Sequence, residues 1–195
     1  MATTATPTGA EPVDTLSASG SFSGKVRHIK IASNYGTAVF YGDFVKLVAA
    51  GTVEKAAVTT AVVAGTVGIF MGCSFTDPTT NQMTFSQHYP ASTVASDIMA
   101  YVCDDPKLLF RMQGDEAIAQ TGLGNNISAV STAGSTSIGR SKNALDGGSI
   151  ATTNSLPLRV VDFVDGPTSA VGDAFTDCIV TYLPLSHAYE TKLGV

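Results

Sequence analysis

Apolar and polar side chains alternate along much of the chain after residue 25. Residues 27–31, 83–86 and 108–113 each carry apolar side chains at every second position. Because successive side chains of a β-strand point to opposite faces of a sheet, this period predicts half-buried strands. Helical spacing is weak: residues 93–99 and 115–120 could each form one turn.

Longer apolar runs rich in Val, Ile, Phe and Tyr predict further strands with both faces buried. These runs cover residues 39–48, 58–63, 67–71, 98–103, 158–164 and 178–183. Glycine, proline and Asp/Asn clusters interrupt them every 8–15 residues, a spacing typical of strands joined as hairpins. The fold class predicted is therefore all-β, an antiparallel β-barrel or β-sandwich.

The first 24 residues show neither the two-residue period of a strand nor the spacing of a helix. Eighteen of them are Thr, Ser, Ala, Gly or Pro, and such a segment buries too little apolar area to offset its ordering entropy. We expect residues 1–24 to form a flexible, extended N-terminal arm that becomes ordered against a neighbouring subunit. Val13, Leu16 and Phe22 are its candidate anchors, and Arg27 and His28 at the start of the following strand are further candidate protein-contact residues.

The remaining residues, 25–195, are expected to form a single β-rich domain. Within it, residues 131–155 are rich in Ser, Thr and Gly and include the turn signal Asp146–Gly147–Gly148. This stretch predicts a long loop or loose hairpin outside the core, exposed or at an interface.

Composition excludes several classes of partner. Only 14% of the residues are charged and the net charge is −5, and the basic residues are scattered, so the sequence predicts no nucleic-acid binding. The longest apolar run, 61–71, is about half as long as a membrane span, so we expect no membrane association. Cys73, Cys103 and Cys178 lie in strand-like segments and are expected to be small buried hydrophobic residues, as in a protein made in a reducing cytoplasm.

No catalytic or ligand-binding motif is complete. Residues 20–25 resemble a phosphate-binding loop but are one residue too short, and 134–139 lack the spacing of a nucleophile elbow. Asp104 and Asp105 precede a proline and read as a turn. The aromatic residues within strand segments, Phe85 among them, are expected in the core. The sequence therefore predicts a protein that is not an enzyme, with no catalytic residues, no cofactor and no metal site.

Residues 67–187 resemble virion proteins of tailed double-stranded DNA bacteriophages, many of them aquatic, that serve as capsid decoration (cement) proteins. The resemblance rests on short strings in a common order: Gly68-Ile-Phe-Met-Gly-Cys73, Thr76-Asp-Pro-Thr79, Tyr89-Pro-Ala-Ser92, Tyr101-Val-Cys-Asp-Asp-Pro106, Ala119-Gln-Thr121, Gly124-Asn-Asn126, Gly139-Arg-Ser-Lys142, Leu145-Asp146, Pro157-Leu-Arg-Val160 and Gly172-Asp-Ala-Phe-Thr176. It implies a β-rich homotrimer, made in the bacterial host, that binds the major capsid protein on the capsid exterior and stabilises the shell by bridging its subunits. Residues 1–60 are not covered.

Three alternatives remain open at this stage. Another virion component, such as a head fibre, neck or tail protein, would suit the same composition and would differ in copy number. A glycan-binding β-sandwich displayed on the capsid would need exposed aromatic side chains, for which Tyr35, Tyr89 and Tyr189 are the candidates. A small hydrolase would need a histidine beside a Ser or Cys nucleophile.

Overall fold

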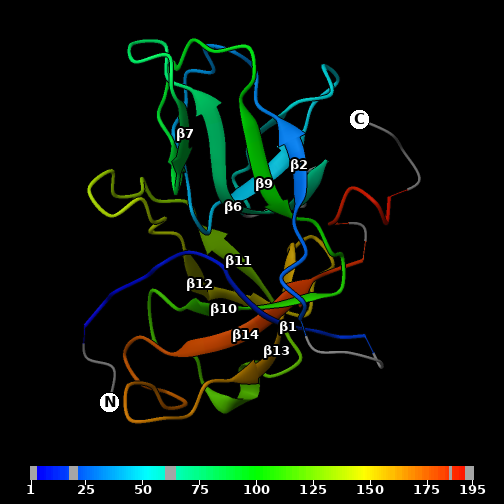
Figure 1. The fold of residues 1–195 in the computed structure, drawn as a ribbon. Helices are drawn as coiled ribbons and strands as arrows, with labels where there is room; N and C mark the ends of the chain where they lie inside the picture. The colour runs from blue at the N-terminus through cyan, green and yellow to red at the C-terminus, as the bar shows by residue number, and fades with distance from the viewer. Residues whose placement is uncertain (1–3, 18–21, 60–64, 185, 192–195) are drawn as a thin grey trace.

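In the computed structural model, which describes residues 4–17, 22–59, 65–184 and 186–191, nearly all regular structure is β-strand. Two six-stranded sheets lie one above the other (Figure 1), and every strand pair within them is antiparallel. The described residues include no α-helix, and a single 3-10 turn covers Gln120–Gly122. The predicted all-β class is confirmed.

Sheet A, the lower sheet in Figure 1, has the order β1-β10-β14-β13-β11-β12. Its strands are β1 (Glu11–Thr15), β10 (Leu108–Gln113), β14 (Asp177–Tyr182), β13 (Leu158–Phe163), β11 (Asn126–Val130) and β12 (Ala144–Ala151). β10 shows the strict alternation of buried and half-buried side chains that its sequence predicts.

Sheet B, the upper sheet, has the order β2-β9-β6-β4-β5, and β7 pairs with the far end of β6. Its strands are β2 (Arg27–Lys30), β9 (Met99–Cys103), β6 (Thr66–Thr76), β4 (Phe44–Leu47), β5 (Val53–Lys55) and β7 (Met83–Ser86). A separate two-stranded ribbon joins β3 (Val39–Phe40) to β8 (His88–Tyr89). The strand expected at residues 58–63 lies partly outside the described residues, and the described part has no strand.

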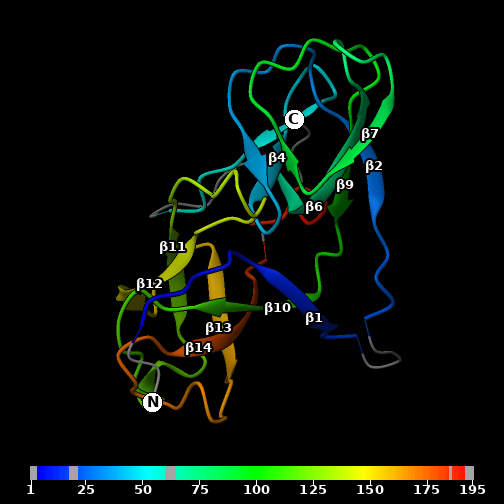
Figure 2. The ribbon, with the colours of Figure 1, turned by 60° about the vertical axis from the view of Figure 1, so that its left-hand side comes forward.

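Two hydrophobic clusters hold the sheets. One lies inside the upper lobe, between sheet B and the β3–β8 ribbon, and includes Phe70, Phe75 and Tyr89. The other joins the two sheets, because it contains Phe44 and Cys103 of sheet B together with the inward residues of β10, β11, β13 and β14. Figure 2 shows from a second side how sheet A meets only the lower part of sheet B.

The N-terminal segment corrects one expectation. Part of residues 1–24, predicted to be an arm with no strand of its own, forms β1 and pairs with β10 of the same chain, with Glu11 opposite Arg111. Ala10 is fully buried, and its N–H donates to the carbonyl of Gly42. Main-chain pairing at a sheet edge requires no hydrophobic period, which is why the pattern did not indicate it. The domain therefore begins before residue 25.

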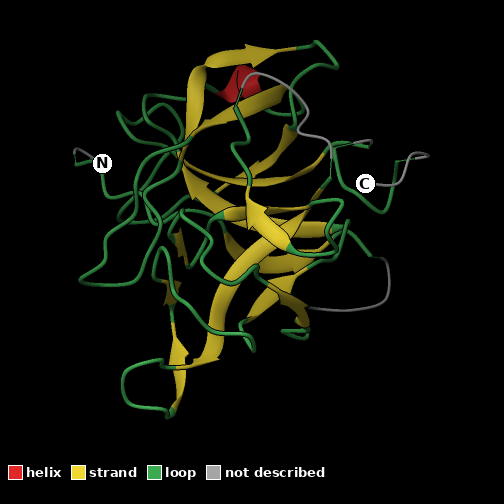
Figure 3. Cartoon of the chain, turned by 90° about the horizontal axis from the view of Figure 1, so that it is seen from above, coloured by secondary structure: helices red, strands yellow, loops and turns green. Residues whose placement is uncertain are grey.

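Residues 131–155 are also more ordered than expected. They contain β12, which forms a hairpin with β11. Leu145 is buried in the cluster between the sheets, and Ala144 is buried as well. The expectation that this stretch lies outside the core is wrong for these residues. The hairpin itself agrees with the sequence, and residues 131–143 form its long connection. Figure 3, in which loops and turns are green, shows how much of the chain lies between the strands.

Candidate interaction surfaces

The five candidate contact residues fall on three different parts of the surface. Val13 and Leu16 lie on and directly after β1, with exposed fractions of 43% and 50%, at the free edge of sheet A. Phe22 packs against the cluster between the sheets, and Arg27 and His28 begin β2. The structure therefore does not gather them into one site.

Phe22 and Arg27 line a polar pocket of about 410 Å³ where the two sheets meet. The buried carboxylate of Asp104 also lines this pocket and accepts hydrogen bonds from Arg27 Nε (2.7 Å) and from the hydroxyl of Tyr189 (3.0 Å). The Arg27 guanidinium also lies over the Tyr189 ring, 5.4 Å from its centroid. Burial, and then the hydrogen bond to Asp104, raises the pKa of Tyr189 above its usual value. These contacts fasten the C-terminal segment to β2 and to the β9–β10 turn.

The predicted turn at Asp104 and Asp105 is confirmed, but its partners were not foreseen. Asp105 accepts from the backbone N–H of Lys107, as a turn aspartate does. Asp104 instead points inward to Arg27 and Tyr189, which lie far from it in the sequence. Nothing in the local pattern distinguishes the two carboxylates.

His28 belongs to a different surface, the outer face of sheet B. Its ring lies 4.6 Å from that of Tyr101, its neighbour on β9. The strand registers place eight side chains on this face: His28, Lys30, Met99, Tyr101, Ser74, Thr76, Met83 and Phe85. Alternate residues of the same strands, such as Ala100 and Val102, point into the core of the upper lobe.

Sheet A covers only one end of this outer face. Cys103 and Ile69 continue the same side of β9 and β6 and are buried in the cluster between the sheets. Beyond them the face is open, and Met83 and Phe85 on β7 are 59% and 73% exposed. We call the open part, from His28 and Lys30 across to Met83 and Phe85, the open sheet face. The expectation that Phe85 belongs to the core is wrong, because β7 has this uncovered side.

The three cysteines provide no reactive nucleophile. All three cysteines are fully buried, as predicted. Burial raises the pKa of Cys73 and Cys178 to about 12 and that of Cys103 to about 11. Since the thiolate is the reactive form, these thiols are inert at neutral pH.

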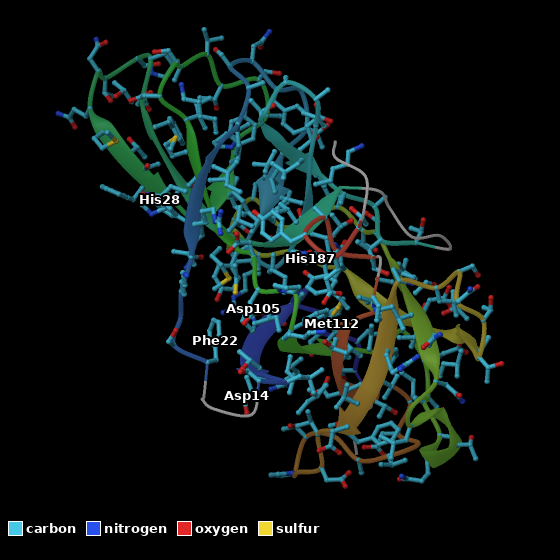
Figure 4. The ribbon with its side chains drawn as sticks, turned by 90° about the vertical axis from the view of Figure 1, so that its right-hand side faces the viewer. Asp14, Phe22, His28, Asp105, Met112 and His187 are labelled. Carbon is cyan, nitrogen blue, oxygen red and sulfur yellow. The ribbon has the colours of Figure 1, made fainter. Side chains whose placement is uncertain are left out.

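His187 lies fully buried where the two sheets meet (Figure 4), with its ring between those of Tyr182 and Tyr189. Its Nδ1 accepts a long hydrogen bond of 3.3 Å from the backbone N–H of Tyr189. Burial lowers the pKa of His187, and this outweighs the opposing effects of the Val67 backbone and of the nearby carboxylates Glu190, Asp104 and Asp105. The neutral imidazole therefore serves as part of the core.

We expect the stability of the fold to decrease on acidification through His187. Its pKa is lower in the folded chain than in the unfolded chain, so its contribution is complete above the unfolded value of about 6.5 and is lost as the pH falls through the folded pKa. The free energy of unfolding should fall by up to about 1.4 kcal/mol per pH unit more in the wild type than in His187→Gln. Urea unfolding of both chains between pH 7.5 and about 5 measures this, and equal slopes would contradict it.

One group of acidic residues could contact a cation. The carboxylates of Asp115, Glu116 and Asp146 have oxygen atoms within 4.8 Å of one another. Asp115 and Glu116 are exposed, and Asp115 already accepts from the N–H of Gly147. Ca²⁺ takes about six to eight oxygen ligands, so three such side chains are a sparse set.

Comparison of the chain with known proteins identified no relative. No protein-family model, no curated protein and no solved structure matches the chain. Among the described residues, none of the helical structure has the length and apolar character needed to span a membrane.

Proposed function

We propose that this chain is a structural virion protein that binds the exterior of a tailed-phage capsid and stabilises it by bridging neighbouring capsid subunits. The observation that carries the proposal is the open sheet face, where large apolar side chains stand uncovered on a chain with few charges. Contiguous exposed apolar residues of this kind mark protein-binding surfaces. The resemblance of residues 67–187 to decoration proteins supplies the identity of the partner, the major capsid protein.

The edge strand β7 supports binding to protein in particular. It pairs only with β6 and carries no charged residue. The other edge strands of the two six-stranded sheets carry charges that discourage pairing: Glu11 and Asp14 on β1, Arg27 and Lys30 on β2, Glu54 on β5, and Asp146 on β12. β1 is further protected by Pro12 and an irregular register. Among the described residues, β7 is thus the edge of the two six-stranded sheets best suited to contact another protein.

Self-association as a homotrimer is part of the proposal and rests on the resemblance. Three weak contacts made together would bind more tightly than one, with a gain of roughly 10² to 10⁴ when the geometry allows all three. Such avidity suits a protein that spans seams between capsid subunits. Light scattering of the purified chain measures the oligomer.

The double variant Met83→Ser/Phe85→Ser should bind undecorated capsids at least about tenfold more weakly than the wild type. Burying each of these side chains contributes about 1.5–3 kcal/mol, and a loss of about 1.4 kcal/mol is already tenfold. The measurement is co-sedimentation with capsids of the phage that encodes the chain. Ile138→Ser is the matched control, because Ile138 is 60% exposed but lies in the β11–β12 connection.

Equal binding by the double variant and the wild type would exclude the open sheet face as the capsid contact. Absence of binding by the wild type itself would contradict the decoration function. The number of copies per virion then distinguishes the alternatives, since a decoration protein occurs in many copies and a head fibre, neck or tail protein in few.

A glycan-binding role on Tyr35, Tyr89 and Tyr189 is not supported by the geometry. Tyr89 is fully buried, and its hydroxyl donates to the backbone carbonyl of Tyr35. Tyr189 lies in the pocket beside Asp104 instead. The three rings therefore form no shared exposed platform.

A further inference from the structure

A buried carboxylate lies at the start of β4 and holds two reactive side chains. Asp43 is fully buried, and one of its oxygens, Oδ2, lies 2.8 Å from the ammonium Nζ of Lys55. The other oxygen, Oδ1, accepts a hydrogen bond of 3.1 Å from the amide Nδ2 of Asn143. An amine and a carboxamide are therefore held on the two oxygens of a single acid.

The other contacts of this group fix it in place. The hydroxyl of Ser141 donates to Asp43 Oδ1 (2.6 Å), and the backbone N–H of Phe40 donates to Oδ2 (2.9 Å). The carbonyl oxygen of Asn143 accepts from the backbone N–H of Thr132 (2.9 Å). These hydrogen bonds fix the orientation of both the Asp43 carboxylate and the Asn143 carboxamide.

The surroundings exclude water. Ser141 and Asn143 are almost completely buried, and only a small part of the Lys55 side chain is exposed. The N-terminal segment covers the group: Gly9, in the left-handed region at φ 77°, packs so closely that a Cβ there would lie 2.6 Å from both the Gly42 carbonyl oxygen and Ser141 Cβ. The ring of Phe40 lies on another side, with its centroid 5.9 Å from Lys55 Nζ.

We propose that Lys55 and Asn143 form an intramolecular isopeptide bond, with Asp43 as the catalytic residue. Asp43 Oδ2 takes one proton from the Lys55 ammonium, and the neutral Nζ attacks Cγ of Asn143. The Cγ–Nδ2 bond breaks, and Nδ2 leaves as ammonia after receiving the second proton of Nζ. Ammonia then takes the proton from Asp43 and departs as ammonium. The carboxylate is restored, no group is oxidised or reduced, and no co-reactant is needed.

Each contact has a role in this step. Asp43 touches both the nucleophile and the leaving group, so it can accept a proton from one and deliver it to the other. The Thr132 N–H points at the oxygen on which negative charge develops. Because one carboxylate holds both the amine and the carboxamide, much of the entropy cost of bringing the reactants together is already met by folding.

The bond would join parts of the fold that are otherwise held by side-chain contacts and by main-chain hydrogen bonds such as that from the Ser141 N–H to the Tyr41 carbonyl. Lys55 ends β5 of sheet B, and Asn143 directly precedes β12 of sheet A. A covalent link there fastens the long β11–β12 connection to the upper lobe. The inference stands on this geometry alone and does not depend on capsid binding.

The test is the intact mass of the purified, folded full-length chain measured after denaturation. The wild type should weigh one ammonia less than its sequence, and digestion should yield a branched peptide that joins Lys55 to Asn143. Lys55→Arg and Asn143→Ala should each restore the full mass of their own sequences. Lys142→Arg, an exposed neighbour of Asn143, is the matched control and should keep the loss.

Three results would overturn the inference. A wild-type mass equal to the sequence means that the group is an ion pair only. A loss of water that persists in Asn143→Ala and disappears in Lys55→Arg means that Lys55 has joined Asp43 instead. A loss of ammonia that persists in Lys55→Arg comes from cyclisation of an asparagine elsewhere in the chain.

Discussion

Replacing Asp43 with alanine should destabilise the fold by about 3–5 kcal/mol, the range for removal of one partner from a buried ion pair. The substitution leaves the Lys55 ammonium without its counter-ion. It also removes the acceptor of Ser141 and Asn143, both buried. Since a domain is stable by only about 5–15 kcal/mol, much of the chain would unfold at moderate temperature.

The measurement is urea unfolding of Asp43→Ala in a Lys55→Arg background, compared with Lys55→Arg alone. Arginine keeps a positive charge at position 55 but cannot form the isopeptide bond, so the comparison is independent of any covalent link. Asp165→Ala, on an exposed residue, is the control and should change stability by no more than about 0.5 kcal/mol. A similarly small change for Asp43→Ala would show that the cluster does not stabilise the fold.

The strands were predictable where apolar side chains either alternate with polar ones or form a continuous buried run. β10 and β2 follow their alternating sequences, and the apolar run at 67–71 lies in β6, the central strand of sheet B. β1 and β5 could not be found in this way, because both are short edge strands held by main-chain hydrogen bonds. The pattern of apolar and polar residues indicates which side chains are buried, but it does not indicate which segments pair at the edge of a sheet.

The candidate surfaces were less predictable for a related reason. The sequence shows that Phe75 and Phe85 lie in strands, but their burial depends on what covers each face. The side chain of Phe75 points into the core of the upper lobe. The side chain of Phe85 lies on the opposite face of sheet B, which sheet A leaves open. The structure places His28, one of the candidate contact residues from the sequence, on the open sheet face beside Tyr101.

The cluster around Asp43 has no local signature at all. Its partners Ser141 and Asn143 are separated from it by 98 and 100 positions in the chain. They meet because the β11–β12 connection folds back against the β3–β4 turn, where Tyr41 and Arg140 form an isolated bridge. Such a group is visible only once the sheets are in place.

Phe44 is one of the side chains through which sheet B enters the cluster between the sheets, together with Ile69 and Cys103. It lies on β4 and is fully buried, and its ring meets the rings of Phe110 (5.7 Å between centroids) and Tyr182 (6.2 Å) edge to face. Edge-to-face pairs of this kind add about 0.5–1.5 kcal/mol each beyond the area that they bury. Three aromatic rings from two sheets therefore form one packing unit.

Phe44→Ala should accordingly lower the free energy of unfolding by about 3–5 kcal/mol, since it removes a buried ring and leaves a cavity that two separate sheets cannot easily close. Thermal or urea unfolding measures the loss. Phe85→Ala is the matched control, because the same atoms are removed from a ring that is 73% exposed, and its effect on stability should stay within about 0.5 kcal/mol. The two phenylalanines thus separate two roles of sheet B: loss of Phe44 should weaken the fold, whereas loss of Phe85 should weaken the proposed binding to the capsid and leave the fold intact. Equal effects of the two substitutions on stability would show that the ring of Phe44 does not join the sheets.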